Sequence, residues 1–268
     1  MAIKLIATDI DGTLVNDERK ITSFTRKVLK QARAKGVYVV LCTGRPVSGI
    51  QNYIEQLELN TTDDFAITFN GAQIQNIGTN EVIARNEISI PDCIELANLS
   101  HQLGIKAQIV TADSDLYVFD QDISRYSVKD AFYTNMELHY REISQLSVKA
   151  TKFMWADEPN KISKTIKQIP QEIKSKYYIV RSEPFFLEFT SPQATKGHAV
   201  IELAQKLGIK QNEIMTVGDE NNDLTMLEAV KHSVAMGNGN EKVKQVASYI
   251  TDDNNHDGLG KAVEKFVL

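Results

Sequence analysis

The sequence predicts an α/β fold, a Rossmann-like doubly wound parallel sheet that forms a core and is interrupted by an inserted α+β domain. At both ends of the chain, apolar β-branched runs alternate with segments of helical spacing. This rhythm implies parallel strands with helices on both faces of the sheet. Between residues 84 and 189 the strand candidates are shorter and partly alternating, and most aromatic residues, including the only tryptophan, lie there.

The first part of the core, residues 1–83, contains three predicted strands and two predicted helices. In the first helix Val28, Leu29 and Ala32 recur on one face, and Gly36 follows as a typical helix stop. The strands are the apolar runs at 3–8, 37–42 and 65–69, and the helices span 22–35 and 47–57.

The rest of the chain divides into the inserted segment, 84–189, and the second part of the core, 190–268. The inserted segment has predicted strands at 106–110, 116–119, 152–155, 177–181 and 185–189, and predicted helices at 92–103 and 160–168. The second core part has predicted helices at 197–207, 223–230 and 259–268, and predicted strands at 213–217, 233–236 and 248–251.

Composition and charge exclude several functional classes. The chain has 268 residues, of which 42% are hydrophobic and 24% charged, as in a globular protein. A net charge of -5 argues against a nucleic-acid-binding surface, which is normally basic. No apolar run approaches the roughly 20 residues that cross a membrane. Because the chain has two cysteines and no recognisable secretory leader, a cytoplasmic location is expected. The protein is expected to be a monomer or a homodimer.

Four predicted strands end in small polar or acidic residues. In an open α/β sheet, ligands bind at the carboxyl ends of the strands, so these residues are expected to share one edge. They are Asp9 and Asp11 after the first strand, Thr43, Gly44 and Arg45 after the second, Asn70 and Gly71 after the third, and Gly218, Asp219, Glu220, Asn221, Asn222 and Asp223 after 213–217.

The acidic residues at this edge form a cluster of hard oxygen ligands. Asp9, Asp11 and Asp219, with Asp223 nearby, have no histidine or cysteine complement, because the five histidines are scattered. Oxygen-only sites suit Mg²⁺. A Mg²⁺ ion would offset the repulsion between the carboxylates and would leave positions for a substrate phosphate.

Two carboxylates on one loop suggest phosphoryl transfer. One can act as a nucleophile through an aspartyl-phosphate, and the other can protonate the leaving oxygen and later deprotonate water. Thr43 and the backbone N–H groups near Gly44 and Gly12 can hold the phosphoryl oxygens. Lys196, at the start of a predicted helix, is the candidate that completes the charge balance.

These residues resemble the haloacid dehalogenase superfamily of phosphohydrolases, and more narrowly its Cof-type sugar-phosphatase subfamily. DIDGTL matches the first motif, DxDGT, and Thr43 in LCTGR matches the second. Lys196 in TKGHAV matches the third, and GDENND at 218–223 matches the fourth. The four motifs occur in order, and the resemblance spans the whole chain.

The resemblance implies a role for each matching residue. Asp9 would be the nucleophile and a Mg²⁺ ligand, and Asp11 the general acid/base whose backbone carbonyl ligates Mg²⁺. Asp219 would be the third protein ligand, with Asp223 orienting the site. The phosphate would contact Gly12, Thr43, Gly44, Lys196 and Asn222. The inserted segment would be a C2-type cap that closes over the site and selects the leaving group.

The expected function is Mg²⁺-dependent hydrolysis of small phosphorylated metabolites. A phosphomutase and a catalytically silent phosphate-binding protein on the same fold remain alternatives, since fold does not determine function. Structural interpretations also remain for single residues: Asn222 and Asp223 can cap a helix, and Arg45 is expected to form a structural or cap-facing salt bridge. Cys42 is expected to pack in its strand.

Overall fold

The computed structural model describes residues 2–268 and divides them into two compact units. The core unit contains the chain up to Ala84 together with Thr195–Leu268, and the inserted unit is Arg85–Ala194. The second boundary lies at Thr195, whereas the sequence places it at 190. The difference arises because the last inserted strand ends at Thr190 and is followed by a turn in which Ala194 N–H donates to Ser191 O (2.8 Å).

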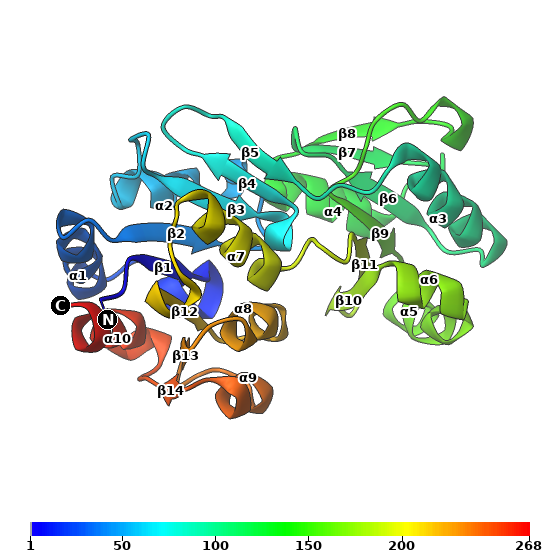
Figure 1. The fold of residues 1–268 in the computed structure, drawn as a ribbon. Helices are drawn as coiled ribbons and strands as arrows, with labels where there is room; N and C mark the ends of the chain where they lie inside the picture. Colours follow the sequence, from blue (N-terminus) through cyan, green and yellow to red (C-terminus); the bar gives the residue numbers. More distant parts are fainter. Residues whose placement is uncertain (1) are drawn as a thin grey trace. The chain divides into compact units, whose positions relative to one another are not determined.

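The core unit confirms the predicted parallel sheet. Within residues 2–268 its order is β14-β13-β12-β1-β2-β3-β4-β5 (Figure 1). The neighbouring pairs from β14 to β3 are parallel. The strands are β1 (Leu5–Thr8), β2 (Tyr38–Cys42), β3 (Phe65–Thr68), β4 (Gln73–Asn76), β5 (Val82–Arg85), β12 (Ile214–Gly218), β13 (His232–Ala235) and β14 (Tyr249–Ile250). Of these, β4 and β5 are not predicted from the sequence, and β4 runs antiparallel to β3.

Helices cover both faces of the core sheet. The helices are α1 (Ser23–Ala34), α2 (Gln51–Gln56), α7 (Lys196–Lys206), α8 (Leu224–Glu228), α9 (Glu241–Val246) and α10 (Gly258–Val267). Side chains of α1, α2 and α10 pack with Ile6 on one face, and those of α7 and α8 pack with Leu5 on the other. Successive strand residues point to opposite faces, so the side chains of β1 pack against the helices on both faces of the sheet. These contacts hold β1 at the centre of the core.

The inserted unit has its own sheet and its own core. The sheet order is β10-β11-β9-β6-β7-β8, with β7 and β8 parallel and the other neighbouring pairs antiparallel. Its strands are β6 (Ala107–Val110), β7 (Asp115–Val118), β8 (Glu137–Tyr140), β9 (Lys152–Ala156), β10 (Tyr178–Glu183) and β11 (Phe186–Thr190). Its helices are α3 (Ile90–Gln102), α4 (Arg125–Thr134), α5 (Pro159–Thr165) and α6 (Gln171–Lys176).

Aromatic side chains fill the core of the inserted unit. Trp155, Phe153 and Phe189 are fully buried and pack with residues of α3, α5 and α6. Trp155 Nε1 donates to Ser100 Oγ at 2.7 Å, so its polar group is satisfied within the core. The sequence does not predict β8, α4 or α6.

Two glycines allow backbone segments of the core unit to approach each other closely at the start of α7. A Cβ atom at Gly71 (φ +100°) would lie 2.3 Å from Thr195 O, and one at Gly197 would lie 2.2 Å from Thr225 O. Thr195 caps α7 by accepting the His198 N–H (3.2 Å). Gly197 N–H donates to Thr225 Oγ1 (3.1 Å). These contacts fix the position of Lys196, the first residue of α7.

None of the helices in the described part of the chain is long and apolar enough to cross a membrane.

Gly197→Ala is expected to destabilise the protein by about 1–3 kcal/mol, because the new methyl group overlaps the Thr225 carbonyl and forces α7 away from α8. Chemical denaturation monitored by circular dichroism measures the change. His198→Ala, one residue further along the same helix at a half-exposed side chain, is the control and should shift stability by less than about 0.5 kcal/mol. Equal stability of Gly197→Ala and wild type would contradict the close approach.

Candidate active site

The turn after β1 places Asp9 at the carboxyl edge of the sheet. Asp9 N–H donates to Val217 O of β12 (3.0 Å), which extends the parallel pairing by one residue. The chain then makes a wide turn, Ile10–Leu14, closed by Val15 N–H donating to Ile10 O (3.1 Å). Gly12 adopts φ +75°, and a Cβ atom there would lie 2.3 Å from Asp219 Oδ2. Only glycine lets this turn approach Asp219 so closely.

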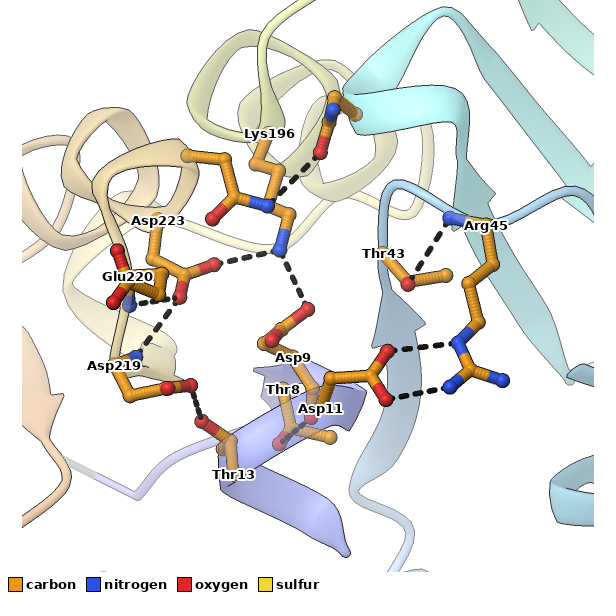
Figure 2. A network of polar contacts seen from close by, with 12 residues as sticks. Thr8, Asp9, Asp11, Thr13, Thr43, Arg45, Lys196, Asp219, Glu220 and Asp223 are labelled. Atoms are coloured by element: carbon orange, nitrogen blue, oxygen red, sulfur yellow. Dashed lines mark hydrogen bonds and ion pairs between the residues drawn. The ribbon is translucent and has the colours of Figure 1, made fainter. Parts of the chain in front are cut away.

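Lys196 joins two carboxylates from distant parts of the chain. Its Nζ donates to Asp9 Oδ1 and to Asp223 Oδ1, each at 2.6 Å (Figure 2). The side chains of Lys196 and Asp223 are fully buried, and that of Asp9 is 8% exposed. A buried ammonium group is stable only when it is paired, so the position of each of these groups depends on the others.

The loop after β12 positions Asp219 and Asp223. Asp223 Oδ2 accepts the backbone N–H groups of Asp219 (2.9 Å) and Glu220 (3.0 Å), so both of its carboxylate oxygens are engaged. Asp219 Oδ1 accepts the Thr13 hydroxyl at 2.6 Å. Asp219 is thereby held between the turn after β1 and its own loop, with Oδ2 on the side of Gly12.

Three buried carboxylates share a single ammonium group. One oxygen from each of Asp9, Asp219 and Asp223 lies within 4.8 Å of the other two. Burial raises the pKa of Asp9, against the effect of Lys196, and raises the pKa of Asp219 to about 7. Burial alone would lower the pKa of Lys196, but its pairing with Asp223 and Asp9 outweighs this and raises it. A further positive charge at this cluster would favour the ionised carboxylates.

The donor set fits a divalent cation that prefers oxygen. Asp9 and Asp219 use Oδ1 in the contacts above, which leaves Oδ2 of each, whereas both oxygens of Asp223 already accept hydrogen bonds. Carboxylate oxygens without imidazole or thiolate match Mg²⁺ rather than Zn²⁺. The residues present are therefore able to hold such an ion.

The carboxylate of Asp11 lies apart from this cluster. It points to the Arg45 guanidinium, with Nε–Oδ2 at 2.7 Å and Nη2–Oδ1 at 2.5 Å (Figure 2). The Asp11 side chain is 53% exposed, in contrast to the buried Asp9. The sequence predicts a salt bridge for Arg45 that is structural or faces the cap. The predicted salt bridge is present, and its partner is Asp11, an acidic residue of the first motif within the core unit.

The remaining predicted residues lie on neighbouring loops of the core unit. Thr43 is buried at the end of β2, and its Oγ1 accepts the Arg45 N–H (3.2 Å). Asn222 Nδ2 donates to Asn70 Oδ1 (3.1 Å), which links the loop after β12 to the one after β3. A Cβ atom at Gly44 would lie 3.0 Å from the same Asn70 oxygen. Asn70 thus bonds to Asn222 and lies close to Gly44, two of the predicted phosphate-contacting residues.

Several supporting contacts cannot be predicted from the sequence. Thr13 belongs to the first motif, yet its hydrogen bond to Asp219 has no signature in the sequence. Asn238 Nδ2 donates to Gly12 O (2.9 Å) from the segment 237–239, which reads as an ordinary glycine turn. Asn70, at a predicted strand end, supports Asn222. Cys42, by contrast, is buried in β2 as predicted.

The chain is similar to known proteins along nearly its whole length. Residues 6–263 match the family model of haloacid dehalogenase-like hydrolases. A protein of Streptococcus pyogenes serotype M6, provisionally named a phosphatase, is 41% identical over 100% of both chains. The 5-amino-6-(5-phospho-D-ribitylamino)uracil phosphatase YcsE of Bacillus subtilis is 31% identical, over 99% of this chain and 96% of its own.

Solved structures give the same result. A haloacid dehalogenase-like hydrolase from Bacteroides thetaiotaomicron has a TM-score of 0.84 and 28% identity, covering 98% of this chain and 99% of that chain. The subclass IIB sugar phosphatase BT4131 has a TM-score of 0.77 and 28% identity, covering 98% of each chain. The chain therefore belongs to the haloacid dehalogenase-like hydrolase family, and it is a phosphatase of that family.

Proposed function

We propose that this phosphatase is Mg²⁺-dependent and hydrolyses small phosphorylated metabolites through an aspartyl-phosphate on Asp9. The observation that carries the proposal is the Asp9 carboxylate, buried at the carboxyl edge of a parallel sheet and bonded to Lys196 next to Asp219. A carboxylate held this rigidly is suited to attack phosphorus in line.

Asp9, Asp219 and the backbone carbonyl of Asp11 would hold the ion, and Asp223 would orient the site. Asp223 is suited to that role because its two oxygens already accept from Lys196 and from two backbone N–H groups. When bound, Mg²⁺ would supply positive charge that neutralises the transferring phosphoryl group.

In the first half of the reaction, a carboxylate oxygen of Asp9 attacks phosphorus as the bond to the leaving oxygen breaks. Asp11 gives its proton to that oxygen, so the product leaves as an alcohol. In the second half, water attacks phosphorus, Asp11 takes a proton from it, and the bond between phosphorus and Asp9 breaks. Ester and water thus become alcohol and phosphate, and both aspartates return to their starting forms.

Five groups of the core unit are proposed to hold the phosphoryl oxygens. They are the Thr43 hydroxyl, the backbone N–H groups near Gly12 and Gly44, the Lys196 ammonium and the Asn222 side chain. Hydrogen-bond donors fixed before the reaction stabilise the charge that develops in the transition state without reorganising. The hydrogen bond from Asn222 to Asn70 restrains one of these donors before substrate binds.

The proposed leaving group is a sugar or sugar-alcohol chain. One relative is named as the phosphatase of a phosphoribityl compound and one structural neighbour as a sugar phosphatase. We also propose that the inserted unit, residues 85–194, acts as the cap that selects among such leaving groups. Phosphate release from a panel of sugar, sugar-alcohol and nucleoside monophosphates tests this choice, and a preference for nucleotides would count against it.

Asp9→Asn is expected to lower kcat on the order of 10⁴-fold or more, because the amide keeps the shape of the side chain but is not a nucleophile. Phosphate release from 4-nitrophenyl phosphate with Mg²⁺ measures it. Asp63→Asn, at an exposed aspartate of the core unit, is the matched control and should retain wild-type activity. Activity of Asp9→Asn close to wild type would remove Asp9 from the nucleophile role.

Mg²⁺ is expected to raise the melting temperature of the wild-type protein by several degrees, since a ligand present at about 100 times its Kd stabilises the folded state by about 2.7 kcal/mol. Differential scanning calorimetry with Mg²⁺ or with a chelator measures the shift without relying on activity. Asp219→Asn should lose most of it, and Asp63→Asn should keep it. A full shift in Asp219→Asn would place the ion elsewhere.

A further inference from the structure

Within residues 2–268, Asp11 pairs through its side chain with one cation, Arg45. Its carboxylate is more than half exposed and stands on the turn that contains Gly12, so little packing restrains the side chain. The bidentate contact with Arg45 fixes both of its oxygens at once. A bidentate pair sets the plane of a carboxylate as well as its position.

Arg45 is itself held firmly. Its Nη1 donates to Gly49 O (3.2 Å), and its guanidinium carbon lies 5.6 Å from the centre of the Tyr53 ring. Tyr53 is a residue of α2 and is buried in the cluster that also contains side chains of α1. The guanidinium is thus fixed by three contacts, one of which is Asp11, and it connects the exposed carboxylate to the packed interior.

We propose that Arg45 is the positioning residue for the acid/base step, fixing the Asp11 carboxyl for proton transfer to the leaving oxygen. This inference rests on the proposed function. In-line transfer puts the leaving oxygen on the side of phosphorus opposite Asp9. Asp9 is buried and Asp11 is exposed, so Asp11 lies on the outer side, where that oxygen must emerge.

The salt bridge is better explained by orientation than by stability. Exposed ion pairs contribute little to folding free energy, and Asp11 is more than half exposed. Arg45 pairs with the carboxylate form of Asp11, which is the form that the first half-reaction produces and the second consumes. The contact therefore strengthens as Asp11 loses its proton in the first half, and it holds the carboxylate that accepts a proton from water in the second.

The test compares kcat/KM across phosphate esters of different leaving groups, because kcat/KM includes only steps up to departure of the alcohol. Arg45→Ala should lower it about 10- to 100-fold for alkyl phosphates, whose leaving oxygen needs a proton, and less than about threefold for 4-nitrophenyl phosphate. Asp11→Asn should show the same dependence on the leaving group. Arg45→Lys, which keeps the charge without the planar fork, should recover only part of the loss.

The double variant supplies the decisive result. If Arg45 acts through Asp11, adding Arg45→Ala to Asp11→Asn should cost less than about threefold more on alkyl phosphates. Arg26→Ala, which removes a cation from an exposed position on α1, is the control for charge and should be unchanged. Losses that are equal for all leaving groups, losses that add to those of Asp11→Asn, or a gain of activity in Arg45→Ala would each overturn the inference.

The outcome is separable from that of the proposed function. Suppose that the wild type is active and that Asp9→Asn loses this activity. If Arg45→Ala then depends on the leaving group as the wild type does, only the role of Arg45 is overturned. A wild type that releases no phosphate from any ester, or an Asp9→Asn variant that is fully active, would overturn the proposed function and this inference with it.

Discussion

The structure of the site depends on one interaction, the contact of the buried Lys196 ammonium with Asp9 and Asp223. The ammonium group lowers the free-energy cost of burying each carboxylate, and the two carboxylates lower the cost of burying the ammonium group. Removing one member of a buried ion pair leaves an uncompensated charge, at a cost of about 3–5 kcal/mol. The interaction also joins the end of β1, the start of α7 and the loop after β12. The same three side chains therefore determine both the positions of these segments and the balance of charge at this edge of the sheet.

Close backbone packing enforces that constraint. Gly12 admits Asp219, and Gly218 admits the Asp223 side chain, whose atoms would lie 2.5 Å from a Cβ atom at that position. Gly197 brings α7 against Thr225. Because protein interiors are close-packed, the carboxylates have few alternative positions. Their mutual repulsion is thus opposed by packing as well as by Lys196.

The parallel strands could be predicted because they are buried on both faces and appear as continuous apolar runs. The strand β4 could not, since Gln73, Gln75 and Asn76 give it a polar composition, and its place in the sheet comes from pairing with β3. At the site, the motifs identify Asp9, Lys196, Asp219 and Asp223, which the structure brings together. The direction of the Asp11 carboxyl could not be predicted, because it depends on Arg45, which lies 34 residues away on another loop.

The order of the chain has a consequence for biosynthesis. Asp9 and Lys196 are 187 residues apart, and Thr13 and Asp219 are 206 apart. During translation, β1 emerges first but lacks β12 as a neighbour until most of the protein has been made. The inserted unit is continuous in sequence and has its own core, so it can fold while the core unit is still incomplete. The nascent chain thus carries acidic residues whose counter-charge arrives late, and the catalytic edge can form only near the end of synthesis.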